Sequence, residues 1–204
     1  MPVAFGPTGR FPAGLLAIEL PAGDFVVRIH HRTRPPVFFG PKPGVPPQNR
    51  FDAPAGEYRV LYAAERLEGA FVESVLRRPT RRVLRRAFVE ERMWTRLRPA
   101  RSLTLAKILD EGLQFHGVDA SVSASEDYAA SRAFALALHT DFPKLDGLAY
   151  RSRFNNGEIC YAIFDRVPAS DFTVMPGELL DADKRRVDEL MAWHGAVFDT
   201  SSAV

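Results

Sequence analysis

Residues 48–77, QNRFDAPAGEYRVLYAAERLEGAFVESVLR, place a turn, a strand and a helix in direct succession, and they decide the fold class. Pro54 and Gly56 predict a turn, because proline fixes φ and glycine accepts a positive φ. A strand is expected over 58–64, since β-branched and aromatic residues alternate there and place Tyr62 on one face of a sheet. The stretch therefore predicts a mixed fold in which a strand leads straight into a helix.

The helix expected over 65–78 carries the carboxylate of Glu73. Small and apolar residues recur there at three- and four-residue spacing and form one core-facing stripe, made of Leu67, Ala70, Phe71, Ser74 and Val75. Glu73 falls outside this stripe. It is either a solvated helix carboxylate paired with Arg77 four residues on, or part of a site at the end of the preceding strand.

The length and composition favour one domain. With 204 residues and 46% apolar content, the chain can bury one sizeable core, and no linker interrupts residues 1–204. Prolines crowd residues 35–47, where Phe38 and Phe39 indicate an ordered loop that folds back onto the domain. The expectation is a single α/β or α+β domain.

Cysteine content, targeting signals and known motifs indicate the cellular compartment and exclude several classes of protein. The single Cys160 excludes an intramolecular disulfide, and no signal segment or membrane span is visible, which predicts a cytoplasmic protein. The histidines lack the spacings of metal ligands, so no metal site is predicted. Glycine-rich nucleotide loops, a Walker loop, a Gly-x-Ser-x-Gly elbow and a His-Glu-x-x-His motif are all missing from the sequence. Dehydrogenase, P-loop and hydrolase functions therefore receive no support.

Arginines crowd residues 77–101, although the net charge of the chain is only +2. A helix is expected over 81–93 with Thr80 as its N-cap, and it would leave the arginines on the outer side. Such a cluster is either a solvated or partner-facing surface, or a surface for nucleic acid. The nucleic-acid alternative lacks interleaved aromatic residues for base stacking.

Two arginines in the first third of the chain are candidate anion ligands. Arg28 lies in the middle of the strand expected over 24–31, where a guanidinium needs either a structural carboxylate or a bound anion. Arg50 lies in the loop before the turn. Together they could hold phosphate oxygens, which guanidinium forks bind in bidentate fashion.

The second half of the chain contains the clearest local signal. Asn155, Asn156 and Gly157 separate GLAYRSRF from EICYAIFD and predict a β-hairpin, with Ser152 among apolar neighbours. The serine hydroxyl needs a partner, either in the backbone or in a site. A helix over 123–139 opens with a capping box of Ser123 and Glu126, and a terminal helix is expected over 183–198.

In their order, these pieces resemble the RES domain, a family named for an arginine, a glutamate and a serine. The resemblance covers about residues 24–175 and rests on the following segments: VVRIH with Arg28, NRFD with Arg50, VLYAAERLEGAFVES with Tyr62 and Glu73, DYAASRAFA, and DGLAYRSRFN with Ser152. It implies an α+β fold like that of mono-ADP-ribosyltransferases, with a central, largely antiparallel twisted sheet flanked by helices.

The resemblance also implies a toxin that consumes NAD at the nicotinamide N-glycosidic bond and is paired with a helix-turn-helix antitoxin. Glu73 would stabilise the positive charge on the ribose, Arg28 and Arg50 would hold the pyrophosphate, Tyr62 would cradle the nicotinamide and Ser152 would orient the glutamate or the ribose. NAD would be a substrate, with no prosthetic group, and inorganic phosphate a possible co-substrate. Nucleic acid would be contacted only through the antitoxin. The alternatives are ADP-ribosyl transfer to a protein, and an arginine-rich binding module without catalysis.

Overall fold

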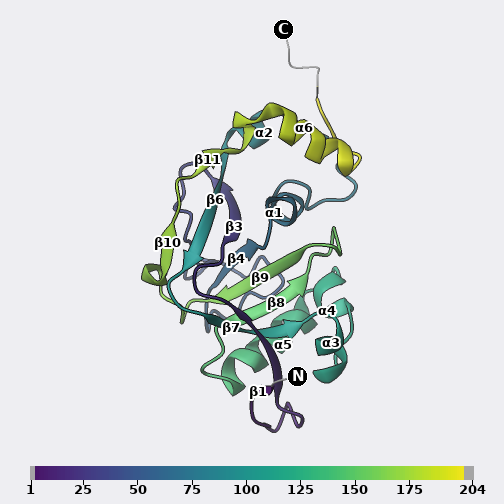
Figure 1. The fold of residues 1–204 in the computed structure, drawn as a ribbon. Helices are drawn as coiled ribbons and strands as arrows, with labels where there is room; N and C mark the ends of the chain where they lie inside the picture. The colour runs from purple at the N-terminus through teal and green to yellow at the C-terminus, as the bar shows by residue number, and fades with distance from the viewer. Residues whose placement is uncertain (1–2, 200–204) are drawn as a thin grey trace.

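One large sheet organises the chain in the computed structural model, which describes residues 3–199 (Figure 1). In spatial order its strands are β1 (Val3–Phe5), β2 (Leu15–Leu20), β7 (Leu103–Ile108), β8 (Gly147–Arg151), β9 (Ile159–Phe164), β4 (Val60–Ala64), β3 (Val26–His31), β6 (Arg92–Pro99) and β10 (Phe172–Val174), and β11 (Glu178–Leu179) also pairs with β6. The β7–β8 pair is parallel and the other pairs are antiparallel. The expectation of a mixed fold with a largely antiparallel sheet is confirmed.

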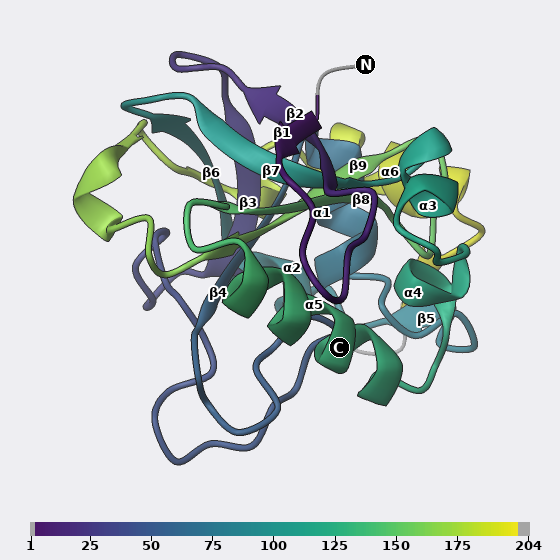
Figure 2. The ribbon, with the colours of Figure 1, turned by 90° about the horizontal axis from the view of Figure 1, so that it is seen from below.

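Helices cover the sheet and close its ends. They are α1 (Leu67–Ser74), α2 (Ala87–Glu90), α3 (Glu111–Phe115), α4 (Ser121–Ala124), α5 (Ala129–Asp141) and α6 (Lys184–Trp193). Seen from below, α5 crosses one face of the sheet (Figure 2). A small parallel pair, β5 (Val83–Leu84) with β12 (Val197–Phe198), lies outside the main sheet. No helix within residues 3–199 is long and apolar enough to cross a membrane.

Apolar side chains pack on both faces of the sheet. One cluster joins Phe71 of α1 and Leu138 of α5 to the strands, and the other gathers around Leu61 on the opposite face. Phe39 of the proline-rich loop packs against this second cluster, which confirms that the loop folds back. Burial of this apolar surface is the main stabilising contribution to the fold.

The strand–helix unit at residues 58–74 follows from local sequence. Gly56 adopts φ +86° in the turn, β4 follows, and Tyr62 faces the same cluster as Val60. Helix α1 then begins at Leu67 and ends at Ser74, so it is shorter at both ends than expected. The hairpin is also confirmed: β8 and β9 pair antiparallel through a tight turn that Asn155 stabilises.

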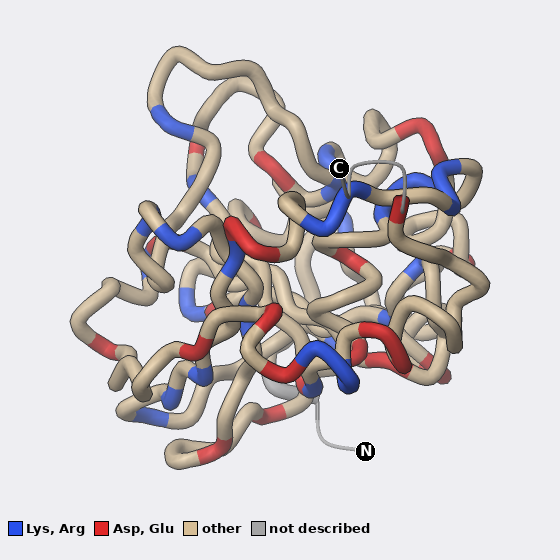
Figure 3. The backbone as a smooth tube through the Cα atoms, turned by 90° about the horizontal axis from the view of Figure 1, so that it is seen from above, with Lys and Arg blue, Asp and Glu red and all other residues tan. Residues whose placement is uncertain are grey.

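The helix expected over 81–93 is wrong. Val83 and Leu84 form β5, α2 has only four residues, and β6 begins at Arg92. From Thr95 to Pro99 buried and exposed residues alternate with the period of two that is typical of a strand. This segment forms a strand because it pairs with β3, which is distant in the sequence. Figure 3 shows several Lys and Arg positions gathered on the side of the molecule where the described chain ends. There Arg82, a residue of this run, donates to the carbonyl of His194.

The expected helix over 123–139 is wrong at its start. Ser123 lies inside α4, where its hydroxyl donates to the carbonyl of Ala120, and Glu126 pairs with Arg153 instead of closing a capping box. Helix α5 begins at Ala129 after this break. A distant arginine therefore outcompetes the local cap for the carboxylate.

The terminal helix is shorter than expected. Asp183 caps α6 by accepting from the backbone of Arg186, and Val187, Leu190 and Met191 are buried as the apolar pattern predicts. The helix ends at Trp193, two residues before Gly195, which adopts φ +63°. The chain then continues as β12 instead of as helix.

His139 in α5 makes the fold sensitive to acid. Its ring stacks on Tyr58 at a centroid distance of 4.4 Å, and burial, followed by the charge of Arg166, lowers its pKa from 6.5 to about 4. Between these values the unfolded chain binds more protons than the folded protein, so stability falls as the pH drops from 6.5 toward 4.

We expect His139→Phe, which keeps an aromatic ring on Tyr58, to reduce this loss. The measurement is urea unfolding of both proteins at pH 7 and pH 5. Equal losses of unfolding free energy in the two proteins would mean that the acid sensitivity has another source.

Candidate active site

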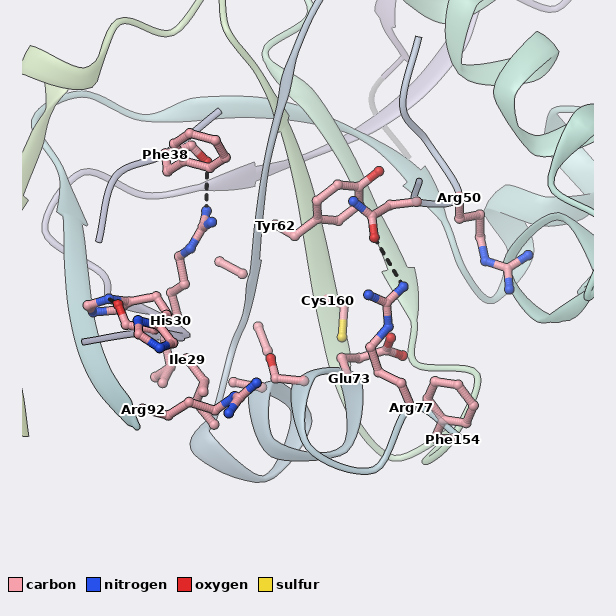
Figure 4. A pocket seen from close by; sticks show the side chains of 18 of the residues that line it. Ile29, His30, Phe38, Arg50, Tyr62, Glu73, Arg77, Arg92, Phe154 and Cys160 are labelled. Carbon is pink, nitrogen blue, oxygen red and sulfur yellow. Dashed lines mark hydrogen bonds between the residues drawn. The ribbon is translucent and has the colours of Figure 1, made fainter. Parts of the chain in front are cut away.

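A cavity of about 410 Å³ opens where β3 and β4 part (Figure 4). The two strands pair at Val27 and Ala64, and farther along β4 the loop residue Gly40 pairs with Val60 in place of β3. Consecutive residues of both strands line the opening, together with α1, the loop before β4 and the β8–β9 hairpin. Its volume lies in the range of small-molecule sites.

Glu73 lies at one side of this cavity and is held by Ser152. The Ser152 hydroxyl donates to Glu73 Oε1 at 2.7 Å and accepts from the backbone N–H of Phe154. Ser152 is fully buried just beyond the end of β8, whereas Glu73 is half-buried. The hairpin and the helix thus meet at a carboxylate with a fixed orientation and an accessible side.

The pairing of Glu73 with Arg77 is not formed. Arg77 instead donates to the side-chain oxygen of Asn49 at 3.0 Å, across the cavity wall (Figure 4). Since no ion pair holds Glu73 within the described chain, its carboxylate has only the Ser152 hydroxyl as a side-chain partner there. The ion pair with Arg77 that the structural alternative required is therefore absent.

Asp52 organises the loop that carries Arg50. Its carboxylate is fully buried and accepts three hydrogen bonds, from the backbone N–H groups of Gln48 and Asn49 at 2.8 and 2.7 Å and from the hydroxyl of Tyr62 at 2.9 Å. The Tyr62 hydroxyl also accepts from the N–H of Phe51. Burial and the Asp52 charge raise the pKa of Tyr62 well above its ordinary value, so it stays a neutral phenol.

Arg50 enters the cavity with unused hydrogen-bonding capacity. The residue is 7% exposed, and its Nη1 is buried without a partner. The guanidinium lies 4.6 Å from the ring centroid of Tyr128, and this cation–π contact offsets only part of the desolvation. Burial lowers the pKa of Arg50. A buried guanidinium donor without a partner in the cavity wall indicates a site for an anionic ligand.

Arg28 lines the same cavity, on the side of β4 opposite to Arg50. Its Nη1 donates to the carbonyl of Phe38 at 2.9 Å, and burial followed by the charge of Arg34 lowers its pKa to about 10, so it stays charged at neutral pH. Phe38 and Arg50 lie on opposite sides of the cavity in Figure 4. Arg28 and Arg50 therefore face one cavity from two sides and do not form a single fork.

The structure brings all five predicted site residues together at this cavity. Arg28, Arg50, Tyr62 and Glu73 line it, and Ser152 lies behind Glu73 as its hydrogen-bond donor. Their catalytic and binding roles stay predictions.

Sequence reasoning missed several lining residues, namely His30, Arg34, Arg92, Tyr128, Tyr150 and Arg153. His30, Tyr128, Tyr150 and Arg153 lie within the segments that carry the resemblance, but the sequence alone assigns them no role. Arg34 and Arg92 lie outside those segments. Asp52 could have been found, because an aspartate that follows an asparagine and an arginine in a proline-bounded turn is a typical loop anchor.

The floor of the cavity is unreactive. Cys160 is buried beside Glu73, and burial followed by the Glu73 charge raises the pKa of its thiol far above the ordinary value. No group of three or more metal-ligating side chains was found among residues 3–199. Besides this thiol, the titratable side chains that line the cavity are thus a carboxylate, phenols, imidazoles and guanidinium groups.

Comparisons with known proteins agree with this fold and identify the family. A chain in the crystal structure of the M. tuberculosis MbcT–MbcA toxin–antitoxin complex superposes with a TM-score of 0.62 at 13% sequence identity, covering 85% of this chain and 92% of that chain. No curated protein matches. The RES domain family model matches residues 25–183, close to the range expected from the sequence, and the chain belongs to the RES-domain family.

Proposed function

We propose that this protein is the toxin of a toxin–antitoxin pair and cleaves the nicotinamide N-glycosidic bond of NAD. The observation that carries the proposal is Glu73, held by Ser152 at 2.7 Å in a cavity otherwise rich in guanidinium groups. An anionic dinucleotide matches the cations, and the single carboxylate matches the one point where positive charge develops during the reaction.

The bond to be broken joins C1′ of the ribose to the ring nitrogen of nicotinamide. The bonding electron pair leaves with the ring, which becomes neutral nicotinamide and needs no general acid. Positive charge then spreads over C1′ and the ring oxygen of the ribose. Glu73 would stabilise this charge through the ribose, and the Ser152 hydroxyl would keep the carboxylate in position.

The arginines would hold the two phosphates of NAD. Arg50 offers a buried Nη1 without a partner, and Arg28 offers the donors that its bond to Phe38 leaves free. One arginine on each side of β4 suits a pyrophosphate that crosses the opening. Tyr62, neutral and fixed by Asp52, would present its ring to nicotinamide between them.

The acceptor of the ADP-ribosyl group defines the exact reaction. Water would give ADP-ribose, inorganic phosphate would give the 1-phosphate, and a protein side chain would give ADP-ribosyl transfer. All three share the departure of nicotinamide, so the site described above supports each of them equally.

An antitoxin partner is part of the proposal. The similar fold was crystallised as a toxin–antitoxin complex, which supports a protein that binds this chain and blocks its activity. We propose a helix-turn-helix antitoxin in the cytoplasm, so that contact with DNA passes through the partner.

The test is nicotinamide release from NAD by the purified, antitoxin-free protein. The products are separated after incubation with and without phosphate, and labelled NAD reports any transfer to protein. If a folded protein leaves NAD intact in every condition, the proposed reaction is excluded.

Ser152→Ala tests the positioning of Glu73. We expect the rate of nicotinamide release at saturating NAD to fall about 10- to 100-fold, because a hydrogen bond to a charged group is lost. The bound fraction of NAD should change little. Ser152→Cys, which returns a weaker donor, should recover part of the rate, whereas an unchanged rate in Ser152→Ala would remove the serine from the mechanism.

A further inference from the structure

The cavity holds more positive charge than NAD requires. Its arginines are Arg28, Arg34, Arg50, Arg77, Arg92 and Arg153, and Glu73 provides the one carboxylate among its described lining residues. Arg153 is paired with Glu126 at 2.6 Å, and the others form no ion pair with a described residue. Oxidised NAD carries two negative phosphates and one positive ring, so it would neutralise only a small part of this charge.

Part of the surplus comes from three arginines of the cavity lining that we call the β3-end cluster: Arg28, Arg34 and Arg92. The charge of Arg34 acts on Arg28, and Arg92 lies in register with His31 at the end of β3. Figure 4 shows His30 and Phe38 on one side of β4 and Glu73 and Arg50 on the other, and the Arg92 side chain reaches toward the start of α1. Arg28, which donates to Phe38, is therefore separated from the carboxylate by the strand.

Two members of this cluster are not used by the proposed reaction. Arg34 is exposed, and its side chain forms no hydrogen bond with a described residue. Arg92 stacks on Phe88 and donates to the carbonyl of Phe88, which fixes the guanidinium. The charge of the neighbouring Glu91 acts on Arg92, but Glu91 forms its ion pair with His31, 3.9 Å from Nε2, and with neither arginine.

Like charges gathered without a carboxylate repel each other and are costly unless an anion binds between them. The most compact anion that suits several guanidinium groups is a phosphomonoester, which carries close to two negative charges and three acceptor oxygens at neutral pH. A phosphate at this place would face Arg34 and Arg92 from the mouth of the cavity, with Arg28 next to it.

We propose that the β3-end cluster binds the 2′-phosphate of NADP, so that NADP is a substrate of this protein. This rests on the proposed function, because the same C1′–nitrogen bond breaks, its electron pair leaves with nicotinamide, and the acceptor bonds to C1′. With water as acceptor, the products are nicotinamide, ADP-ribose 2′-phosphate and a proton. A phosphate attached to the adenosine ribose lies at the far end of the dinucleotide from C1′, as Arg28 lies across β4 from Glu73.

The experiment compares kcat/KM for NADP and NAD in wild type, Arg34→Gln and Arg32→Gln. Arg32 is a matched control, since it is exposed in the same turn but does not line the cavity. We expect NADP to be cleaved at least as efficiently as NAD by wild type. The NADP/NAD ratio should fall about tenfold in Arg34→Gln, the range for one charged hydrogen bond at a partly exposed site, and stay unchanged in Arg32→Gln.

A binding measurement separates this inference from the proposed reaction. Calorimetric titration should show adenosine 2′,5′-bisphosphate binding about tenfold or more tightly than adenosine 5′-monophosphate, with the advantage reduced in Arg34→Gln. If NAD is cleaved but NADP is cleaved less than about one-tenth as efficiently, the inference is overturned and the proposed function stands. If neither dinucleotide is cleaved while the bisphosphate binds through Arg34, the reaction fails and the phosphate subsite stands.

Free phosphate is the other source of the same chemistry. If inorganic phosphate binds wild type in an Arg34-dependent way and the bisphosphate has no advantage over the monophosphate, the assignment to NADP is wrong. An equal loss of NAD and NADP cleavage in Arg34→Gln would also overturn it, because the arginine would then serve both substrates alike.

Discussion

Glu73→Gln should reduce nicotinamide release from NAD by about 10²- to 10³-fold, the usual cost of removing one group that stabilises charge in a transition state. The amide keeps the shape of the side chain and an oxygen that can still accept from the Ser152 hydroxyl. The unfolding free energy should therefore change by less than about 1 kcal/mol. The measurement is the rate at saturating NAD, followed by chromatography of nicotinamide, with urea unfolding of the same samples.

Glu65→Gln is the matched control. Glu65 is exposed directly before α1, so the same chemical change is made outside the cavity, and the rate should stay within about twofold of wild type. If Glu73→Gln retains more than about a tenth of the wild-type rate while folded, the carboxylate does not stabilise the transition state and the arginine-rich cavity needs another reaction.

The parts of the fold that could be predicted from sequence are those that neighbouring residues determine. The hairpin of β8 and β9 follows from an asparagine–glycine turn between alternating strands. The passage from β4 into α1 follows from a change of period within ten residues of Gly56. Both carry site residues, so Tyr62, Glu73 and Ser152 could be placed without knowledge of the tertiary structure.

The errors in predicted secondary structure arise where a partner distant in the sequence determines the local conformation. The arginine-rich segment has a helical pattern in its first half, but Val83 pairs with Val197 and β6 pairs with β3 along six positions. Glu126 has the spacing of a capping box, yet Arg153 takes its carboxylate. Such pairings join residues far apart in the chain, and local propensity contains no information about them.

The same reason limits what sequence shows of the site. Its two candidate arginines are visible because a charge in a strand and a charge in a proline-rich loop are both unusual. Arg34 and Arg92 are ordinary surface residues by pattern, and only the separation of β3 from β4 brings them to the cavity. The opening itself depends on Gly40 taking the place of β3 beside Val60, which no local rule predicts.

The loop that carries Arg50 is the part of the site that we expect a single substitution to disturb most. Asp52→Ala should lower the unfolding free energy by about 3 to 5 kcal/mol, because it leaves two backbone N–H groups and the Tyr62 hydroxyl without their buried acceptor. With the carboxylate gone, Asn49 and Arg50 lose their fixed positions at the cavity wall. The KM for NAD should therefore rise more than kcat falls, since phosphate binding depends on Arg50.

Tyr62→Phe separates the contribution of the Tyr62–Asp52 hydrogen bond from that of the backbone bonds to Asp52. It removes one of the three hydrogen bonds to Asp52 and the acceptor of the Phe51 N–H, and leaves the two backbone bonds to Asp52, so it should cost about 1 to 3 kcal/mol of unfolding free energy. Urea unfolding and NAD kinetics of the two single variants and the double variant measure the coupling between the residues. If Asp52→Ala costs no more than Tyr62→Phe and leaves KM unchanged, the backbone bonds of Asp52 do not position Arg50. The position of Arg50 would then depend on its contact with Tyr128 and on the other bonds of the loop, such as those from Arg132 to the carbonyls of Pro47 and Asn49.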